Sequence, residues 1–123
     1  MNENEVEVNG IKYVRKDSIN SSSKMPTKKG MTYSIVRTYS AGVFAGWIGK
    51  LNGKAGRVFN ARRIWYWDGA ASLSQLSQEG TSKPENCKFP MEVSHTDLTE
   101  IIEGLPCTEK AKKSIESVPI WKR

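Results

Sequence analysis

Residues that carry out acid–base, redox or metal chemistry are scarce in this sequence, which has one histidine and two cysteines among 123 residues. Cys87 and Cys107 form neither a CxxC pair nor a Cys/His spacing typical of zinc, so we predict two buried thiols and no metal site. His95 is expected in a solvated turn, and the carboxylates are scattered. No GxSxG, HExxH or P-loop pattern occurs. The residues therefore favour a protein that is not an enzyme and has no cofactor.

Long hydrophobic runs are also absent, because no apolar stretch approaches the roughly 20 residues that a membrane helix needs. The first residues, Met1 to Glu5, are acidic, where a secretory signal would carry a basic segment before an apolar one. We therefore expect a cytoplasmic protein without a membrane partner. Hydrophobic residues make up 37% of the chain, which suits one compact domain with a modest core.

Positive charge is in excess, since 19 Lys and Arg against 13 Asp and Glu give a net charge of +6. This balance favours an anionic partner such as nucleic acid, a nucleotide or an acidic surface. A cationic protein that is merely soluble is the alternative.

Two short segments precede the main domain, which we place over residues 32–123. Asn9-Gly10 lies between alternating apolar positions, which predicts a small hairpin arm within residues 1–20. Residues 21–31 are rich in Ser, Lys and turn formers, which predicts a flexible basic linker.

Within the domain, period-two alternation predicts a three-strand antiparallel meander over residues 32–39, 43–50 and 56–67, with a tight turn at Asn52-Gly53 before the third strand. Asp68 is placed to cap a short helix that begins around Ala70 and stops at Gly80.

The remaining residues predict two strands and a helix. The strands are expected over 88–93 and 98–105, separated by a turn at His95-Thr96-Asp97. The 98–105 segment also fits helical spacing, and we favour the strand. Thr108 can cap a final helix over 109–117. The sum is an α+β fold, with an antiparallel sheet of about five strands and two short helices.

The segment from Arg57 to Trp67 interleaves arginines with aromatic residues, a combination that suits a nucleotide. A guanidinium can hold a phosphate through two parallel hydrogen bonds, and an aromatic ring can stack on a base. In one continuous strand, Arg63, Trp65 and Trp67 would share a face, and the opposite face would carry Arg62, Ile64 and Tyr66. The alternative is that the tryptophans are core residues and the arginines lie over them.

Several segments resemble a known family of small phage and prophage proteins. They are Ile35 to Gly46, Asn60 to Trp67, Ala70 to Leu76 and Thr108 to Ile115. Together, over roughly residues 32–121, the chain resembles the first-described Thoeris anti-defence family, the phage sponges for glycocyclic ADP-ribose. The run from Asn60 to Leu76 is the most specific part.

The resemblance implies a protein that sequesters cyclic ADP-ribose isomers made by TIR-domain defence enzymes, without hydrolysing them, in the cytoplasm of the infected bacterial host. It also implies a homo-oligomer, a dimer or a trimer of dimers, with the ligand near a subunit interface. Cyclic di- or trinucleotides are a further ligand class in the family. The alternative function is a phage regulator that binds nucleic acid.

Within the matching segments, chemistry selects the candidate ligand-binding residues. They are Arg37, Phe44, Arg57, Asn60, Arg62, Arg63, Trp65 and Phe89.

Overall fold

The computed structural model describes residues 25–122, and the hairpin predicted within residues 1–20 lies outside them. Six antiparallel strands and two short α-helices form one domain, which confirms the predicted α+β class. Among the described residues, no helix is long and apolar enough to cross a membrane.

The first two strands form a tight hairpin. β1 (Thr27–Lys28) pairs with the start of β2 (Met31–Thr38), and Lys29 and Gly30 between them both have positive φ angles. We predicted that Thr27 and Lys28 lie in a flexible linker over residues 21–31. In the structure, these two residues form β1 and pair with β2, which begins at Met31.

The predicted meander is present, with a shorter third strand. β2 pairs with β3 (Val43–Ile48), and β3 pairs with β4 (Gly56–Arg63). The turn predicted at Asn52-Gly53 is confirmed by a bridge between Asn52 and Ala55. β4 ends at Arg63 rather than Trp67, and only an isolated bridge at Tyr66 follows.

The next strand lies later in the chain than expected. β5 (Val93–Leu98) contains the residues predicted as the His95–Asp97 turn, whereas 88–93 forms only isolated bridges before Val93. β5 lies at the end of the sheet path, and its polar residues are tolerated because one side of an edge strand faces solvent. The segment predicted over 98–105 forms most of a strand, β6 (Ile101–Pro106), rather than a helix, while Leu98 ends β5.

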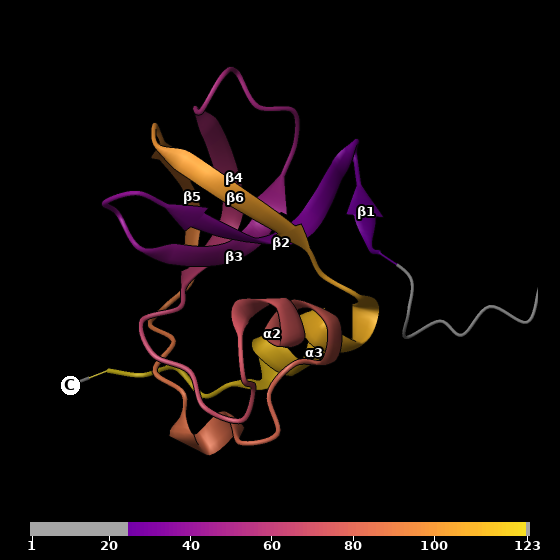
Figure 1. The fold of residues 1–123 in the computed structure, drawn as a ribbon, viewed down its shortest axis with the longest axis vertical. Helices are drawn as coiled ribbons and strands as arrows, with labels where there is room; N and C mark the ends of the chain where they lie inside the picture. Colours follow the sequence, from indigo (N-terminus) through magenta and orange to yellow (C-terminus); the bar gives the residue numbers. More distant parts are fainter. Residues whose placement is uncertain (1–24, 123) are drawn as a thin grey trace, which may run out of the picture.

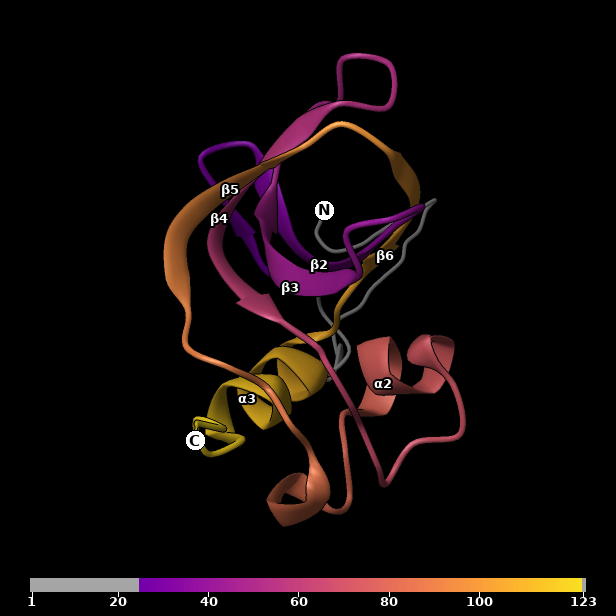
Figure 2. The same ribbon diagram turned by 90° about the vertical axis from the view of Figure 1, so that its left-hand side faces the viewer.

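The sheet curls into an open ring. β6 pairs with β2, on the opposite side from β3, while β5 pairs only with β4. The turn between β5 and β6 therefore spans the two ends of the sheet, as Figure 2 shows. Inside the curl lies an inner core of Val36, Phe44, Val58, Ala61, Leu98 and Ile101.

The two helices cover the other face of the sheet (Figure 1). α2 (Leu73–Glu79) is capped by Ser72 rather than Asp68, and Gly80 ends it as predicted. α3 (Glu109–Ser117) is capped by Thr108, also as predicted. Between helices and sheet lies a helix-side core that includes Tyr33, Ile35, Ala45, Ile64, Leu76, Phe89, Cys107 and Ile115.

A β-bulge at Asn60 changes which side chains of β4 face each core. Asn60 has a φ of 52°, and the pairing with β3 shifts by one residue between Phe59 and Arg62. As a result, both Val58 and Ala61 face the inner core, although alternation would put them on opposite faces. Arg62 is turned toward the helices, and Arg63 is turned toward the inner core.

Candidate functional site

Adjacent arginines of β4 have opposite environments, and Arg62 lies inside the protein. It is 6% exposed, and its guanidinium donates four hydrogen bonds to backbone carbonyl oxygens. The acceptors are Phe89, Pro90, Ile115 and Val118, at 2.7 to 3.1 Å. Burial lowers the pKa of Arg62, while the nearby Tyr33 and Glu92 raise it. The guanidinium thus satisfies carbonyls at the end of α3 and in the 89–90 segment, which is a structural role.

Two other candidate arginines are held by carboxylates on neighbouring strands. Arg57 contacts Asp97 through Nε at 2.6 Å and Nη2 at 3.1 Å, and Arg37 contacts Glu103 at 2.9 Å. The hydrogen bond with Arg57 lowers the pKa of Asp97 below its usual value. Both pairs are exposed to solvent, so a phosphate would have to compete with a carboxylate already in place.

Arg63 is the candidate arginine whose guanidinium stays available. It lies 4.5 Å from the centre of the Phe44 ring and donates to the carbonyl of Ala41. Among residues 25–122, no carboxylate forms an ion pair with it, so further N–H groups face solvent or a ligand. Gly42, with a φ of 104°, allows this approach, because a Cβ there would lie 3.2 Å from Nη1.

Two open hollows meet at Arg63. The first, of about 320 Å³, is lined by Phe44, Ala61, Arg63, Pro90, Met91, Val93, His95 and Thr96. The second, of about 380 Å³, is lined by Ser40, Ala41, Gly42, Val43, Arg63, Ile64, Trp65 and Trp67. Both volumes fall within the range of small-molecule sites, although neither hollow is enclosed. Because Arg63 lines both hollows, one ligand bound to Arg63 could extend into each of them.

An aromatic platform adjoins the second hollow. The indoles of Trp65 and Trp121 stack with centroids 5.1 Å apart and planes 6° from parallel. The Lys88 amine lies within 6 Å of the rings of Trp65, Tyr66 and Trp121. Trp65 is 59% exposed, so an indole face or edge remains open to a flat ligand. We call Arg63, Lys88, Trp65 and Trp121 the arginine–tryptophan face.

Of the remaining candidates, only Phe44 adjoins this face. Phe89 is fully buried in the helix-side core, and the nearly buried Phe44 presents its ring to Arg63. Asn60 forms the bulge and donates to Glu92 at 3.1 Å. Of the eight candidates, the structure brings Arg63, Phe44 and Trp65 together around the two hollows.

Sequence reasoning missed Lys88 and Trp121. Trp121 reaches Trp65 because the chain after α3 runs parallel to Phe89, bridging it at Ile120. Nothing in the spacing of the two tryptophans indicates this contact. Among the described residues, no group of His, Cys, Asp and Glu could hold a metal ion.

Comparison with known protein families gives a match over most of the domain. Residues 31–115 match the family model DUF6948, a domain of unknown function. The chain belongs to the DUF6948 family. The matched DUF6948 region contains β2 to β6 and most of α3, and therefore Arg63, Trp65 and Lys88 but not Trp121. No curated protein and no solved structure matches the chain.

Proposed function

We propose that this protein binds a cyclic ADP-ribose isomer, such as glycocyclic ADP-ribose, at the arginine–tryptophan face and sequesters it without hydrolysing it. The observation that carries the proposal is Arg63, a guanidinium without an ion-pair partner among the described residues, placed between two hollows and beside the exposed Trp65. The ligand's diphosphate would accept hydrogen bonds from Arg63, and its adenine would stack on the tryptophan platform.

Both hollows are open to solvent, which limits the affinity that one copy of the chain can have for a nucleotide. A ligand of about 35 heavy atoms can approach nanomolar affinity at roughly 0.3 kcal/mol per atom only if most of it is enclosed. We therefore propose that a second copy of the chain covers the face, in a dimer or a trimer of dimers. Exposed apolar residues around the first hollow support such a contact, since Met91 is 66% and Val93 48% exposed.

The biological role follows from the sequence resemblance to the Thoeris anti-defence sponges. The protein would act in the cytoplasm of an infected bacterium and remove a messenger made by TIR-domain enzymes, so that the effector is not activated. Sequestration needs at least one site per messenger molecule. Cyclic di- or trinucleotides are proposed as a second ligand class.

The test is calorimetric titration of the full chain with glycocyclic ADP-ribose, followed by chromatography of the ligand recovered after heat denaturation. We expect binding and an intact ligand. Arg63→Ala and Trp65→Ala should each weaken binding about tenfold or more. Arg57→Ala removes the same charge at the other end of β4 and serves as the matched control, with unchanged affinity. Absence of binding, or a cleaved product, would overturn the proposal.

The alternative, a regulator that binds nucleic acid, is favoured by the stacked tryptophans with a lysine beside them, because single strands bind such platforms. It predicts oligonucleotide affinity that falls steeply with salt, as counterions are released from the phosphates. A titration at two salt concentrations, with oligonucleotide and with the cyclic nucleotide, separates the two functions.

A further inference from the structure

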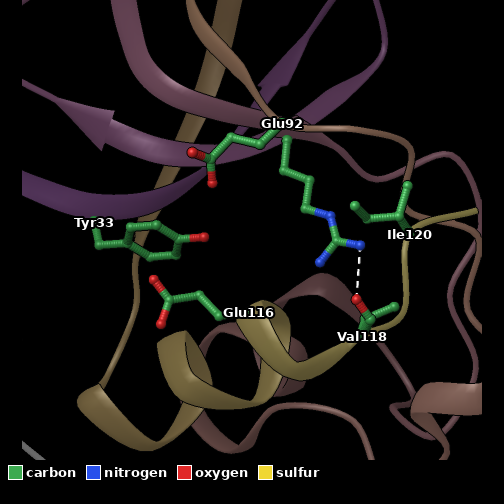
Figure 3. A pocket seen from close by; sticks show the side chains of 6 residues that line it. Tyr33, Glu92, Glu116, Val118 and Ile120 are labelled. Atoms are coloured by element: carbon green, nitrogen blue, oxygen red, sulfur yellow. Dashed lines mark hydrogen bonds between the residues drawn. The ribbon is translucent and has the colours of Figure 1, made fainter.

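A separate cavity of about 180 Å³ lies between the sheet and the end of α3. Its lining residues are Tyr33, Arg62, Glu92, Glu116, Val118 and Ile120 (Figure 3). None of them lines either hollow beside Arg63. The cavity has room for about six water molecules at ~30 Å³ each, so it suits a small molecule or one ring of a larger one.

The hydroxyl of Tyr33 is the unusual group in this cavity. The side chain is 4% exposed and its ring packs edge-on against Trp47, with centroids 5.5 Å apart. Figure 3 shows the hydroxyl pointing into the cavity. Within residues 25–122 the hydroxyl has no hydrogen-bond partner, although buried hydroxyl groups almost always have one. The cavity is open to water, and a ligand hydroxyl could take the place of a water molecule as this partner.

The protonation state of Tyr33 determines which hydrogen bonds its hydroxyl can make. Burial raises the pKa of Tyr33 above its ordinary value, and the nearby carboxylate of Glu116 raises it further. The phenol is therefore neutral at physiological pH and can both donate and accept a hydrogen bond.

The other polar groups complete a mixed set of donors and acceptors. Arg62 uses four of its five N–H groups on backbone carbonyls, which leaves one N–H on Nη1. Glu92 accepts from Asn60 at 3.1 Å and Glu116 pairs with Lys112 at 3.0 Å, each through Oε2, which leaves Oε1 of both carboxylates for a ligand. Figure 3 shows both carboxylates on the same side of the cavity as the Tyr33 ring. The charges of Arg62 and Lys112 balance those of Glu92 and Glu116, so the cavity favours neither an anion nor a cation. Neutral hydroxyl groups, which donate and accept, match the set best.

We propose that this cavity binds the hydroxyl groups of a pentose, with a vicinal diol donating to Glu92 and Glu116 and accepting from Tyr33 and Arg62. Adjacent hydroxyls of a furanose ring can reach two acceptors at once, and carboxylates are well suited to ribose hydroxyls. Val118 and Ile120 supply the apolar wall for the ring carbons. The inference does not depend on the nucleotide proposal, because the two sites share no lining residue.

The test is a titration of the full chain with D-ribose, followed by amide chemical shifts in ¹H–¹⁵N NMR spectra. We expect millimolar binding, with shifts centred on Tyr33, Glu116 and Val118. Tetrahydrofuran carries the ring without the hydroxyls, ethylammonium chloride tests a cation, and sodium phosphate tests an anion. Absence of ribose-dependent shifts, or equal binding of any of the three other probes at these amides, would overturn the proposal.

Tyr33→Phe is the decisive variant, and Tyr39→Phe is its control because Tyr39 is 79% exposed. Removing the Tyr33 hydroxyl should weaken ribose binding about fivefold, as expected for one neutral hydrogen bond. It should not lower the melting temperature, since the hydroxyl has no protein partner to lose. Equal ribose affinity in Tyr33→Phe and wild type would overturn the proposal. Tyr33→Phe should bind glycocyclic ADP-ribose as tightly as wild type does. The ribose result can then be distinguished from the test of nucleotide binding at Arg63.

Discussion

The Arg62 guanidinium donates a hydrogen bond to the carbonyl oxygen of Val118, 2.7 Å away across 56 residues of sequence. Val118 follows the last turn of α3, where backbone carbonyls lack partners within the helix. The positive charge also lies at the negative end of the helix dipole. One side chain of β4 therefore fixes the end of α3 against the sheet.

Replacing Arg62 by methionine should destabilise the protein strongly. The four carbonyls that Arg62 contacts would lose charged donors in a buried environment, so we expect a loss of about 3 kcal/mol or more in unfolding free energy. Urea denaturation followed by circular dichroism measures it. The exposed Arg57 provides the matched control, and Arg57→Met should lose much less, because solvent screens its ion pair. Similar losses in the two variants would contradict this role for Arg62.

Gly46→Ala should disrupt the bulge. Gly46 lies opposite the bulged residues of β4, and a Cβ there would come within 2.6 Å of Val58 Cγ1 and 2.7 Å of the Phe59 carbonyl oxygen. We expect destabilisation of about 1–3 kcal/mol, measured as a lower melting temperature. Gly104→Ala, also in a strand, meets no atom within 4 Å and should change stability little. A neutral Gly46→Ala would show that β4 can shift its register without penalty.

The two cysteines should resist modification in the native protein. Both are buried and not disulfide-bonded, and burial raises the pKa of Cys107 to about 12. The reactive thiolate of Cys107 is therefore scarce at neutral pH. Labelling with a thiol reagent should be slow in buffer and fast in urea. Rapid labelling of Cys107 under native conditions would show that the helix-side core opens readily.

The ion pair between Arg57 and Asp97 should contribute to stability only above acidic pH. The folded-state pKa of Asp97 lies below its unfolded value, so its contribution is present above about pH 4 and is lost as the pH falls through the folded pKa. Asp97→Asn should be less stable than wild type at pH 7, and the difference should shrink as the pH falls below 4 and vanish below the folded pKa of Asp97. A difference that persists unchanged at pH 2 would exclude ionisation as its cause.

Much of the fold could be predicted because local signals agree with it. The alternation from Thr32 gives β2, and Asn52-Gly53 gives the next turn. Thr108 caps α3 because its hydroxyl accepts from the Ala111 amide. β5 could not be predicted, because the polar segment around His95 resembles a turn and becomes a strand only by pairing with β4.

The site was less predictable, since a sequence does not show which arginine already has a partner. Arg62 and Arg63 are adjacent residues of the same type. The bulge at Asn60 turns Arg62 toward the helices, where it is buried, and leaves the guanidinium of Arg63 available to a ligand. Likewise, Arg57 looks like a phosphate ligand until β5 brings Asp97 beside it. Trp121 depends on a parallel bridge between segments far apart in the chain, for which no periodicity exists.

The stacked pair of Trp65 and Trp121 also has a practical consequence. Two nearly parallel indoles at 5.1 Å couple their electronic transitions, so the protein carries its own chromophore pair. Exciton circular dichroism and indole emission can therefore report on the geometry of this pair without an attached dye. A guest that inserts between the rings, or displaces one of them, would change the signal during the titration itself.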